Sequence, residues 1–180
     1  HDHKGGQGHP KRRQPRYEQP WLTNLERVKR LDTVCAVGGI MNGTTNFIMD
    51  AMHKAPVDFP AILKEAQDLG YAEADPSADI DGDDIRRKLC ISANIAFDAA
   101  LEETAIPTFG IRTVTAADIA AFRAHGFACK LLARAESTDS GVCAYVEPTL
   151  VGAGDLEAAV PANFNLITYE AEQLGRQSFY

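Results

Sequence analysis

The segment IRRKLCISANIAFDAAL, residues 85–101, constrains the fold more than any other part of the sequence. It is apolar almost all round, whereas a helix at a protein surface keeps one polar face. The pattern therefore predicts a central buried helix. A chain of 180 residues is long enough to pack one good-sized domain with a single core around such a helix.

Two helices are predicted before this segment and one after it. The residues Asn42–Thr45 offer caps to the first helix. Asp58 can cap the second, which carries an apolar stripe at helical spacing and ends at Gly70, a natural C-terminal stop. Downstream, Thr115 followed three residues later by Asp118 has the pattern of a capped helix start.

Strand signals gather mainly in the last third of the chain. Residues 31–40 have the β-branched character of a strand and end in a glycine pair. Residues 128–138 and 141–151 are separated by a turn-prone TDSG and are predicted to form an antiparallel pair of strands. Residues 164–170 and 176–180 are predicted to form another pair. Helices first and strands later predict an α+β class, with a mixed, largely antiparallel sheet packed with helices.

The charge distribution separates a basic lead-in from an acidic body. Residues 1–20 have a balance of +3, and the net charge of the whole chain is −7, which leaves −10 for residues 21–180. An acidic body argues against a nucleic-acid partner. Residues 1–20 are rich in Gly, Pro and Gln and are predicted to be a disordered or irregular lead-in, with a nucleic-acid or nuclear-import segment as the alternative to a solvated tail.

Membrane and metal binding are not expected. Apolar runs are broken by charges before the roughly 18 residues that a membrane span needs, and the N-terminus lacks the apolar segment of a secretory signal. The four cysteines lie far apart, without metal-type spacing: Cys35, Cys90, Cys129 and Cys143. We expect the last three to be buried thiols in a reducing cytoplasm, with a disulfide or zinc site as the alternative.

The stretch GYAEADPSADIDGDDIRRK, residues 70–88, places six carboxylates before two arginines and a lysine. A calcium loop starting at Asp79 fails, because the sixth position is Asp84 instead of Gly and the twelfth is a cysteine instead of Glu. A capped helix start explains more of it. Asp79 or Asp81 would cap, and Asp83 and Asp84 would lie near the positive end of the helix dipole.

A catalytic interpretation of the same stretch depends on where Asp84 and Lys88 point. They are four residues apart, and their face of the helix continues through Ser92 or Ile91 to Ile95, toward the core. A lysine held beside a carboxylate at the edge of the core is a candidate general acid. An ordinary surface ion pair at this spacing stays open as the alternative.

The stretch also carries the signature of a known family. Its matching positions are Ala66, Gly70, Tyr71, Ala72, Asp75, Pro76, Asp79, Ile80, Gly82, Asp84 and Lys88. This pattern resembles that of homoserine dehydrogenase, and the likeness extends over residues 21–180. The resemblance implies a substrate-binding and catalytic domain for the reversible, NAD(P)H-dependent reduction of L-aspartate 4-semialdehyde to L-homoserine, in threonine, methionine and isoleucine biosynthesis.

The resemblance also assigns roles to residues. Lys88 is similar to the lysine that donates a proton beside the reacting oxygen, and Asp84 to the carboxylate that binds substrate and steadies that lysine. Glu73 resembles the glutamate that contacts the substrate ammonium close to the nicotinamide. Gly70 resembles the glycine whose backbone lies against the cofactor, and Asp79 a further acid of the substrate pocket.

The turn Asn42-Gly43-Thr44 lies at a predicted helix N-terminus. Its backbone N–H groups offer a binding site for an anionic or carbonyl part of a ligand, and the amino-acid substrate that the resemblance implies carries both. A plain helix cap is the alternative interpretation of the same three residues.

The sequence departs from the family pattern in its nucleotide half. No glycine-rich dinucleotide fingerprint is present and no βαβ unit precedes Trp21. We therefore expect NADP or NAD to be bound mainly by a nucleotide-binding domain that this chain lacks, and we expect C-terminal truncation after Tyr180. The family further implies a homodimer or homotetramer. The alternatives are a non-catalytic amino-acid-binding or dimerisation module, or a related dehydrogenase with another substrate.

Overall fold

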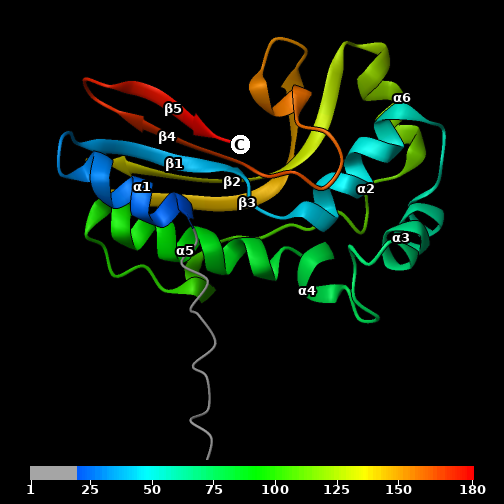
Figure 1. Ribbon diagram of the computed structural model, residues 1–180, viewed down its shortest axis with the longest axis horizontal. Coiled ribbons are helices and arrows are strands. Elements are labelled where there is room, and N and C mark those ends of the chain that lie inside the picture. Colours follow the sequence, from blue (N-terminus) through cyan, green and yellow to red (C-terminus); the bar gives the residue numbers. More distant parts are fainter. Residues whose placement is uncertain (1–19) are drawn as a thin grey trace, which may run out of the picture.

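A five-stranded antiparallel sheet forms the centre of the protein, whose computed structural model describes residues 20–180 (Figure 1). The strand order is β3-β2-β1-β4-β5. The strands are β1 Val34–Ile40, β2 Phe127–Thr138, β3 Gly141–Gly152, β4 Leu166–Ala171 and β5 Gly175–Phe179. The predicted lead-in lies outside the described residues, except for Pro20, which begins the first helix.

Helices cover one face and one end of this sheet. They are α1 Pro20–Lys29, α2 Gly43–Lys54, α3 Phe59–Asp68, α4 Ser77–Ile80, α5 Asp83–Phe97 and α6 Ala116–Ala124, with short 3₁₀ turns η1 Glu103–Ala105 and η2 Leu156–Ala159. In Figure 1, α1 and α5 lie under the sheet, whereas α2, α3 and α6 lie beyond one end of it. The predicted α+β class is confirmed.

The predicted strand pairs are also confirmed. β2 pairs with β3 along their whole lengths, and β4 pairs with β5. β1, the earliest strand in the sequence, lies between β2 and β4 and pairs antiparallel with both. A mixed sheet would also contain parallel strand pairs. In the described residues, parallel pairing is limited to an isolated bridge between Thr108 and Val146.

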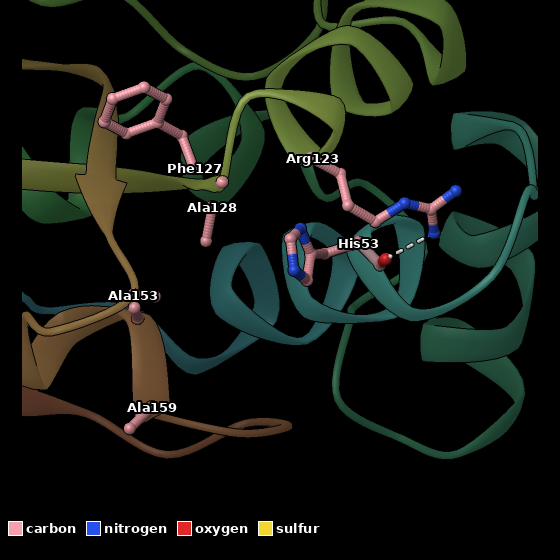
Figure 2. A pocket seen from close by; sticks show the side chains of 8 residues that line it. His53, Arg123, Phe127, Ala128, Ala153 and Ala159 are labelled. Carbon is pink, nitrogen blue, oxygen red and sulfur yellow. Dashed lines mark hydrogen bonds between the residues drawn. The ribbon is translucent and has the colours of Figure 1, made fainter.

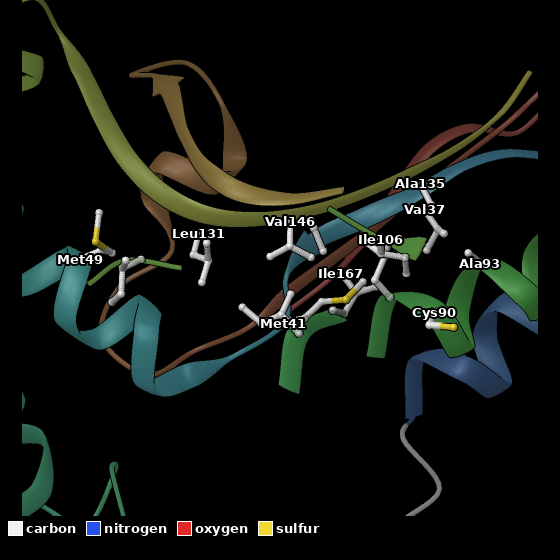
Figure 3. Packing of buried hydrophobic residues seen from close by; sticks show 14 of the residues in the cluster. Val37, Met41, Met49, Cys90, Ala93, Ile106, Leu131, Ala135, Val146 and Ile167 are labelled. Carbon is white, nitrogen blue, oxygen red and sulfur yellow. The ribbon is translucent and has the colours of Figure 1, made fainter. Parts of the chain in front are cut away.

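The predicted central helix is α5, and it packs against the sheet. Ile85, Leu89 and Ala93, at helical spacing, are fully buried. Figure 3 shows Ala93 beneath the sheet residues Val37 and Ala135. Burial of a large aliphatic side chain such as Leu89 stabilises the fold by roughly 1.5–3 kcal/mol. The helix is shorter than the apolar segment, because it ends at Asp98, which has a left-handed backbone with φ of 50°.

Helix α1 is an element that the sequence interpretation missed. Leu25 and Val28 are its buried residues, and with Trp21 they follow the i, i+4, i+7 spacing of one helix face. The Trp21 indole N–H donates to Ser92 Oγ at 3.2 Å and so fixes α1 against α5. The spacing was therefore readable, but the adjoining irregular sequence obscured it.

The structure confirms one of these predicted helix caps and differs from the others. The capping box of Thr115 and Asp118 is confirmed in both directions. Asp58 occupies its N-cap position but its side chain makes no capping bond. The prediction that Asp79 or Asp81 caps α5 is wrong: Gly82 is the N-cap, with φ of 88°, and the Asp81 carboxylate instead binds Arg112 at 2.8 Å.

The cysteines are free thiols, as expected, but one of them lies elsewhere than predicted. Cys90 and Cys129 are buried, whereas Cys143 is exposed, because it lies on the edge strand β3 where alternate side chains face solvent. Residues 20–180 contain no group of three or more His, Cys, Asp or Glu side chains that could hold a metal ion. None of the helices in this described part has the length and apolar character that crossing a bilayer requires.

Cys129 and Cys143 should differ in their reactivity toward thiol reagents. Burial raises the pKa of Cys129 to about 11, so its thiolate is scarce, and the core shields it from reagents. At about pH 8 we expect iodoacetamide to label Cys143 much faster than Cys129 in the folded chain, and at equal rates in urea. Mass spectrometry of digests taken over time measures this. Equal rates in the folded chain would contradict the assignment.

The glycine pair of β1 should be essential for the fold. A Cβ at Gly39 would lie 2.0 Å from the Leu166 carbonyl oxygen, and its φ of +122° disfavours any other residue. Gly39→Ala should lower the free energy of unfolding by about 1–3 kcal/mol or more. Gly154→Ala is the matched control, since nothing lies within 4 Å of its Cβ position. Urea denaturation followed by circular dichroism compares them, and equal midpoints would refute the prediction.

Candidate active site

The ion pair of Asp84 and Lys88 lies at the N-terminal end of α5, at the edge of the core. Lys88 Nζ is 2.6 Å from Asp84 Oδ2 and donates a second hydrogen bond to the Met41 carbonyl at 2.9 Å. The Lys88 side chain is 21% exposed and the Asp84 side chain 32%, so the pair is neither buried nor freely solvated. The predicted pairing and its half-buried place are confirmed. The face continues inward through buried Ser92, whereas Ile91 is exposed.

Asn42 joins this pair to a second carboxylate. Its Nδ2 donates to Asp79 Oδ1 at 2.8 Å and to Asp84 Oδ2 at 3.0 Å. Its Oδ1 accepts the backbone N–H of Thr45 at 2.9 Å, which caps α2. The residue is almost completely buried. One amide therefore completes a helix N-terminus and holds two carboxylates of α4 and α5 beside it.

A continuous chain of hydrogen bonds results, which we call the Asn42 cluster: the Met41 carbonyl, Lys88, Asp84, Asn42 and Asp79. It draws together the β1–α2 junction, α4 and α5. The cluster holds two carboxylates and one ammonium, so with all three ionised it carries one excess negative charge. Such a site can attract a cationic group and can give a proton to a basic one.

Gly43 and Thr44 follow Asn42 at the first turn of α2. A Cβ at Gly43 would lie 2.6 Å from the Asn163 carbonyl oxygen, so glycine permits a close approach there. Thr44 Oγ1 donates to the Tyr71 carbonyl at 2.7 Å and ties α2 to the loop after α3. The cap interpretation of this turn is confirmed by the Asn42–Thr45 bond. Ligand binding by its N–H groups stays a prediction.

Gly70 and Glu73 lie on that tethered loop. Gly70 ends α3 with φ of 78°, as its sequence position predicted. Glu73 is exposed, and its backbone carbonyl accepts a hydrogen bond from Gln67 at 3.0 Å. Within residues 20–180 no hydrogen bond joins the Glu73 carboxylate to the Asn42 cluster. The structure therefore brings Asn42, Asp79, Asp84 and Lys88 together and leaves Glu73 on a neighbouring segment.

Two features of the site were missed from the sequence. The Met41 carbonyl, an acceptor for Lys88, is a backbone group with no residue-type signal. The bridge from Asn42 to two carboxylates joins positions about 40 residues apart in the chain. A cap residue has the same appearance in a sequence whether or not its other side-chain atoms bind a distant partner.

A separate cavity of about 330 Å³ lies at the opposite, C-terminal end of α2 (Figure 2). His53, Arg123 and Phe127 line it together with several alanines, and Arg123 donates to the His53 carbonyl at 3.0 Å. Burial, together with Arg123, lowers the pKa of His53. No residue predicted for the site lines this cavity, and about 16 Å of helix separates its lining residue His53 from Asn42.

Fold and site together define an α+β domain with a lysine–carboxylate pair suited to acid–base chemistry. Comparison with known proteins identifies its family. The family model described as homoserine dehydrogenase matches residues 20–180. The chain is 42% identical over 166 residues to the homoserine dehydrogenase of Corynebacterium glutamicum, and 44% identical over 154 residues to that of Mycobacterium tuberculosis. The chain belongs to the homoserine dehydrogenase family.

Solved structures agree with this assignment. The crystal structure of a homoserine dehydrogenase from Thiobacillus denitrificans has a TM-score of 0.86 at 35% identity, covering 89% of this chain and 37% of that one. The aligned regions cover 89% of this chain and 37% of the Corynebacterium protein, and 83% and 35% for the Mycobacterium protein. The chain thus spans little more than a third of the length of these relatives.

Asn42→Asp tests the bridging contact, because it keeps the capping oxygen and replaces the donor with a third carboxylate. We expect the free energy of unfolding to fall by about 1–3 kcal/mol at neutral pH. The crowded carboxylates of the folded variant bind protons more readily than the unfolded chain does. The loss should therefore shrink as the pH falls toward about 4.

Urea denaturation of wild type and variant across this pH range measures the effect. Asn42→Ser is the control, because it keeps a capping oxygen and adds no charge, so its loss should depend less on pH than the loss in Asn42→Asp. If the loss in Asn42→Asp did not depend more strongly on pH than the loss in Asn42→Ser, the bridge to Asp79 and Asp84 would be wrong.

Proposed function

We propose that this chain is the substrate-binding and catalytic domain of a homoserine dehydrogenase, which reversibly reduces L-aspartate 4-semialdehyde to L-homoserine with NAD(P)H. The observation that carries the proposal is the Lys88 ammonium, held 2.6 Å from Asp84 at the half-buried edge of the core. Residues 21–180 form the substrate-binding unit in this proposal.

The substrate is bound by complementary charge. Its ammonium group is a partner for the carboxylates of Asp79 and Asp84, with Glu73 on the neighbouring loop as a further acid. Its carboxylate fits the N-terminus of α2, where the backbone N–H groups of Gly43 and Thr44 and the helix dipole favour an anion. The excess negative charge of the Asn42 cluster supports this orientation.

Lys88 supplies the proton. As hydride reaches the aldehyde carbon, negative charge develops on the carbonyl oxygen, and an adjacent ammonium stabilises that charge and then protonates it. An ammonium has three N–H donors. In Lys88, two of these N–H groups donate to Asp84 and to the Met41 carbonyl, which fixes the direction of the third N–H group. In the reverse direction the neutral amine removes the hydroxyl proton.

Asn42 acts through the carboxylates in this proposal. Both side-chain N–H groups donate to Asp79 and Asp84, and its Oδ1 is taken up by the helix cap. It therefore contributes to substrate binding by holding two acids in place.

The cofactor is NAD(P), which supplies or accepts the hydride when bound. Residues 20–180 fit only a part of it, because their strands pair antiparallel and provide no parallel βαβ unit for a dinucleotide. Gly70 and Glu73 are the proposed contacts to the nicotinamide end. We propose that a nucleotide-binding domain of the same enzyme holds the rest, that the enzyme is a homodimer or homotetramer, and that it is cytoplasmic.

Lys88→Met tests the proposed proton donor. With a supplied nucleotide-binding domain, we expect kcat to fall by about 10²–10⁴-fold, because the donor in the transition state is lost. NADPH absorbance with aspartate semialdehyde measures turnover, for the chain alone and with the added domain. Lys64→Met is the matched control, since Lys64 forms an exposed i, i+4 pair with Asp68 and, in the described residues, makes no hydrogen bond to the Asn42 cluster. Normal turnover by Lys88→Met would refute the assignment.

Calorimetric titration separates the rival substrates. L-homoserine should bind to the chain more tightly than L-aspartate, whose second carboxylate would meet the acidic Asn42 cluster. Tighter binding of aspartate would count against the proposal.

A further inference from the structure

Lys130 on β2 is a lysine in an unusual environment. It is 2% exposed, and among the described residues no carboxylate oxygen lies within 4 Å of its ammonium. It donates instead to Asn46 Oδ1 at 2.9 Å and to the Val160 carbonyl at 2.8 Å. Burial lowers the pKa of Lys130, an effect that nearby Asp50 partly opposes. Burying an ammonium is costly, so its partners need an explanation.

Asn46, its side-chain partner, lies on α2 and is equally buried. Its Nδ2 lies among carbonyl oxygens of the segment 160–164, at 2.8 Å from Ala162 O and 3.2 Å from Phe164 O. Lys130 and Asn46 therefore bind the same segment from β2 and from α2. Together they replace the hydrogen bonds that this irregular backbone would otherwise make with water.

Segment 160–164 is attached to α2 at two further points. The Ala162 N–H donates to Asp50 Oδ2 at 2.8 Å, and the Asn163 carbonyl packs where Gly43 leaves room. Ala162 has a positive φ of 48°, a conformation that a non-glycine residue keeps only when its surroundings enforce it. The segment thus lies along one face of α2, from its first residue to its third turn.

The N-terminus of α2 connects this segment to the candidate active site. Asn42 is the N-cap of α2, and its carbonyl accepts the backbone N–H of Asn46 at 3.3 Å, so both residues belong to the first turn of the helix. Asn46 binds segment 160–164, and Asn42 binds Asp79 and Asp84. Any shift of α2 along this segment would move Asn42 relative to the two carboxylates.

We propose that Lys130 is a positioning residue: with Asn46 it fixes segment 160–164 against α2 and so sets the place of Asn42 and of the carboxylates that Asn42 holds. Lys130 does not touch the substrate. Its effect on the reaction rests on the proposed function, whereas its effect on Asn42 does not.

Two variants and one control test this in the full chain. Lys130→Met removes the ammonium at similar length. Asn46→Asp keeps an acceptor for Lys130 but loses the donor to the segment carbonyls. Lys54→Met is the matched control, because Lys54 is another lysine close to this region, which binds Asp50 but makes no hydrogen bond to the carbonyls of segment 160–164. If Lys130→Met does not fold, the nearly isosteric Asn46→Asp carries the test.

The primary measurement is the NMR signal of the Asn42 side-chain amide, which reports on its bonds to Asp79 and Asp84 without any ligand. Both variants should shift or broaden this signal, and Lys54→Met should leave it in place. The second measurement is homoserine affinity at a temperature where circular dichroism shows each protein folded. It should fall on the order of tenfold to a hundredfold in both variants, since small displacements of binding groups have effects of this size.

The outcomes are distinguishable. An unchanged Asn42 signal in a folded variant would overturn the inference, even if its melting temperature had dropped, because a merely structural lysine predicts that result. Absence of homoserine binding by the wild type would overturn the proposed function alone. In that case a shifted Asn42 signal would still support the positioning role of Lys130.

Discussion

The side-chain amide of Asn42 is the contact on which the candidate site depends. It caps α2 with its oxygen and binds Asp79 and Asp84 with its nitrogen, while almost completely excluded from solvent. A buried amide of this kind is costly unless all its groups are paired, and here they are. Because cap and carboxylates share one residue, the helix cannot start elsewhere without dispersing the acids.

The central position of β1 in the sheet explains why Asn42 lies beside the N-terminal end of α5. β1 is central, and its glycine pair allows the backbones of β2 and β4 to approach too closely for any side chain. The chain then leaves the sheet directly into the Asn42 turn, and α5 packs beneath β1 with its N-terminal end beside that turn. The Met41 carbonyl, one residue after β1, binds Lys88. The central strand and the buried helix thus fix both halves of the site.

Sequence interpretation succeeded where the determinants are local. The capping box of Thr115 and the pairing of Asp84 with Lys88 are set by spacing within one helix, and both are present. It failed where several arrangements have the same local pattern. Asp81 is as good a cap residue as any, but its partner Arg112 lies 31 residues away and Gly82 takes the cap. The contacts of Asn42 and Lys130 are also set by tertiary packing.

The two lysines show why residue type and flanking pattern do not identify a catalytic group. Lys88 and Lys130 are both followed by apolar sequence, yet Lys88 reaches the edge of the core beside a carboxylate, whereas Lys130 is enclosed among an amide and carbonyls. Proton transfer to a substrate requires contact with it, which only the half-exposed Lys88 can make. An enclosed ammonium is instead useful for organising backbone that has no regular partners. The same residue type is therefore proposed as an acid in one place and as a positioning residue in the other, and only the fold distinguishes the two.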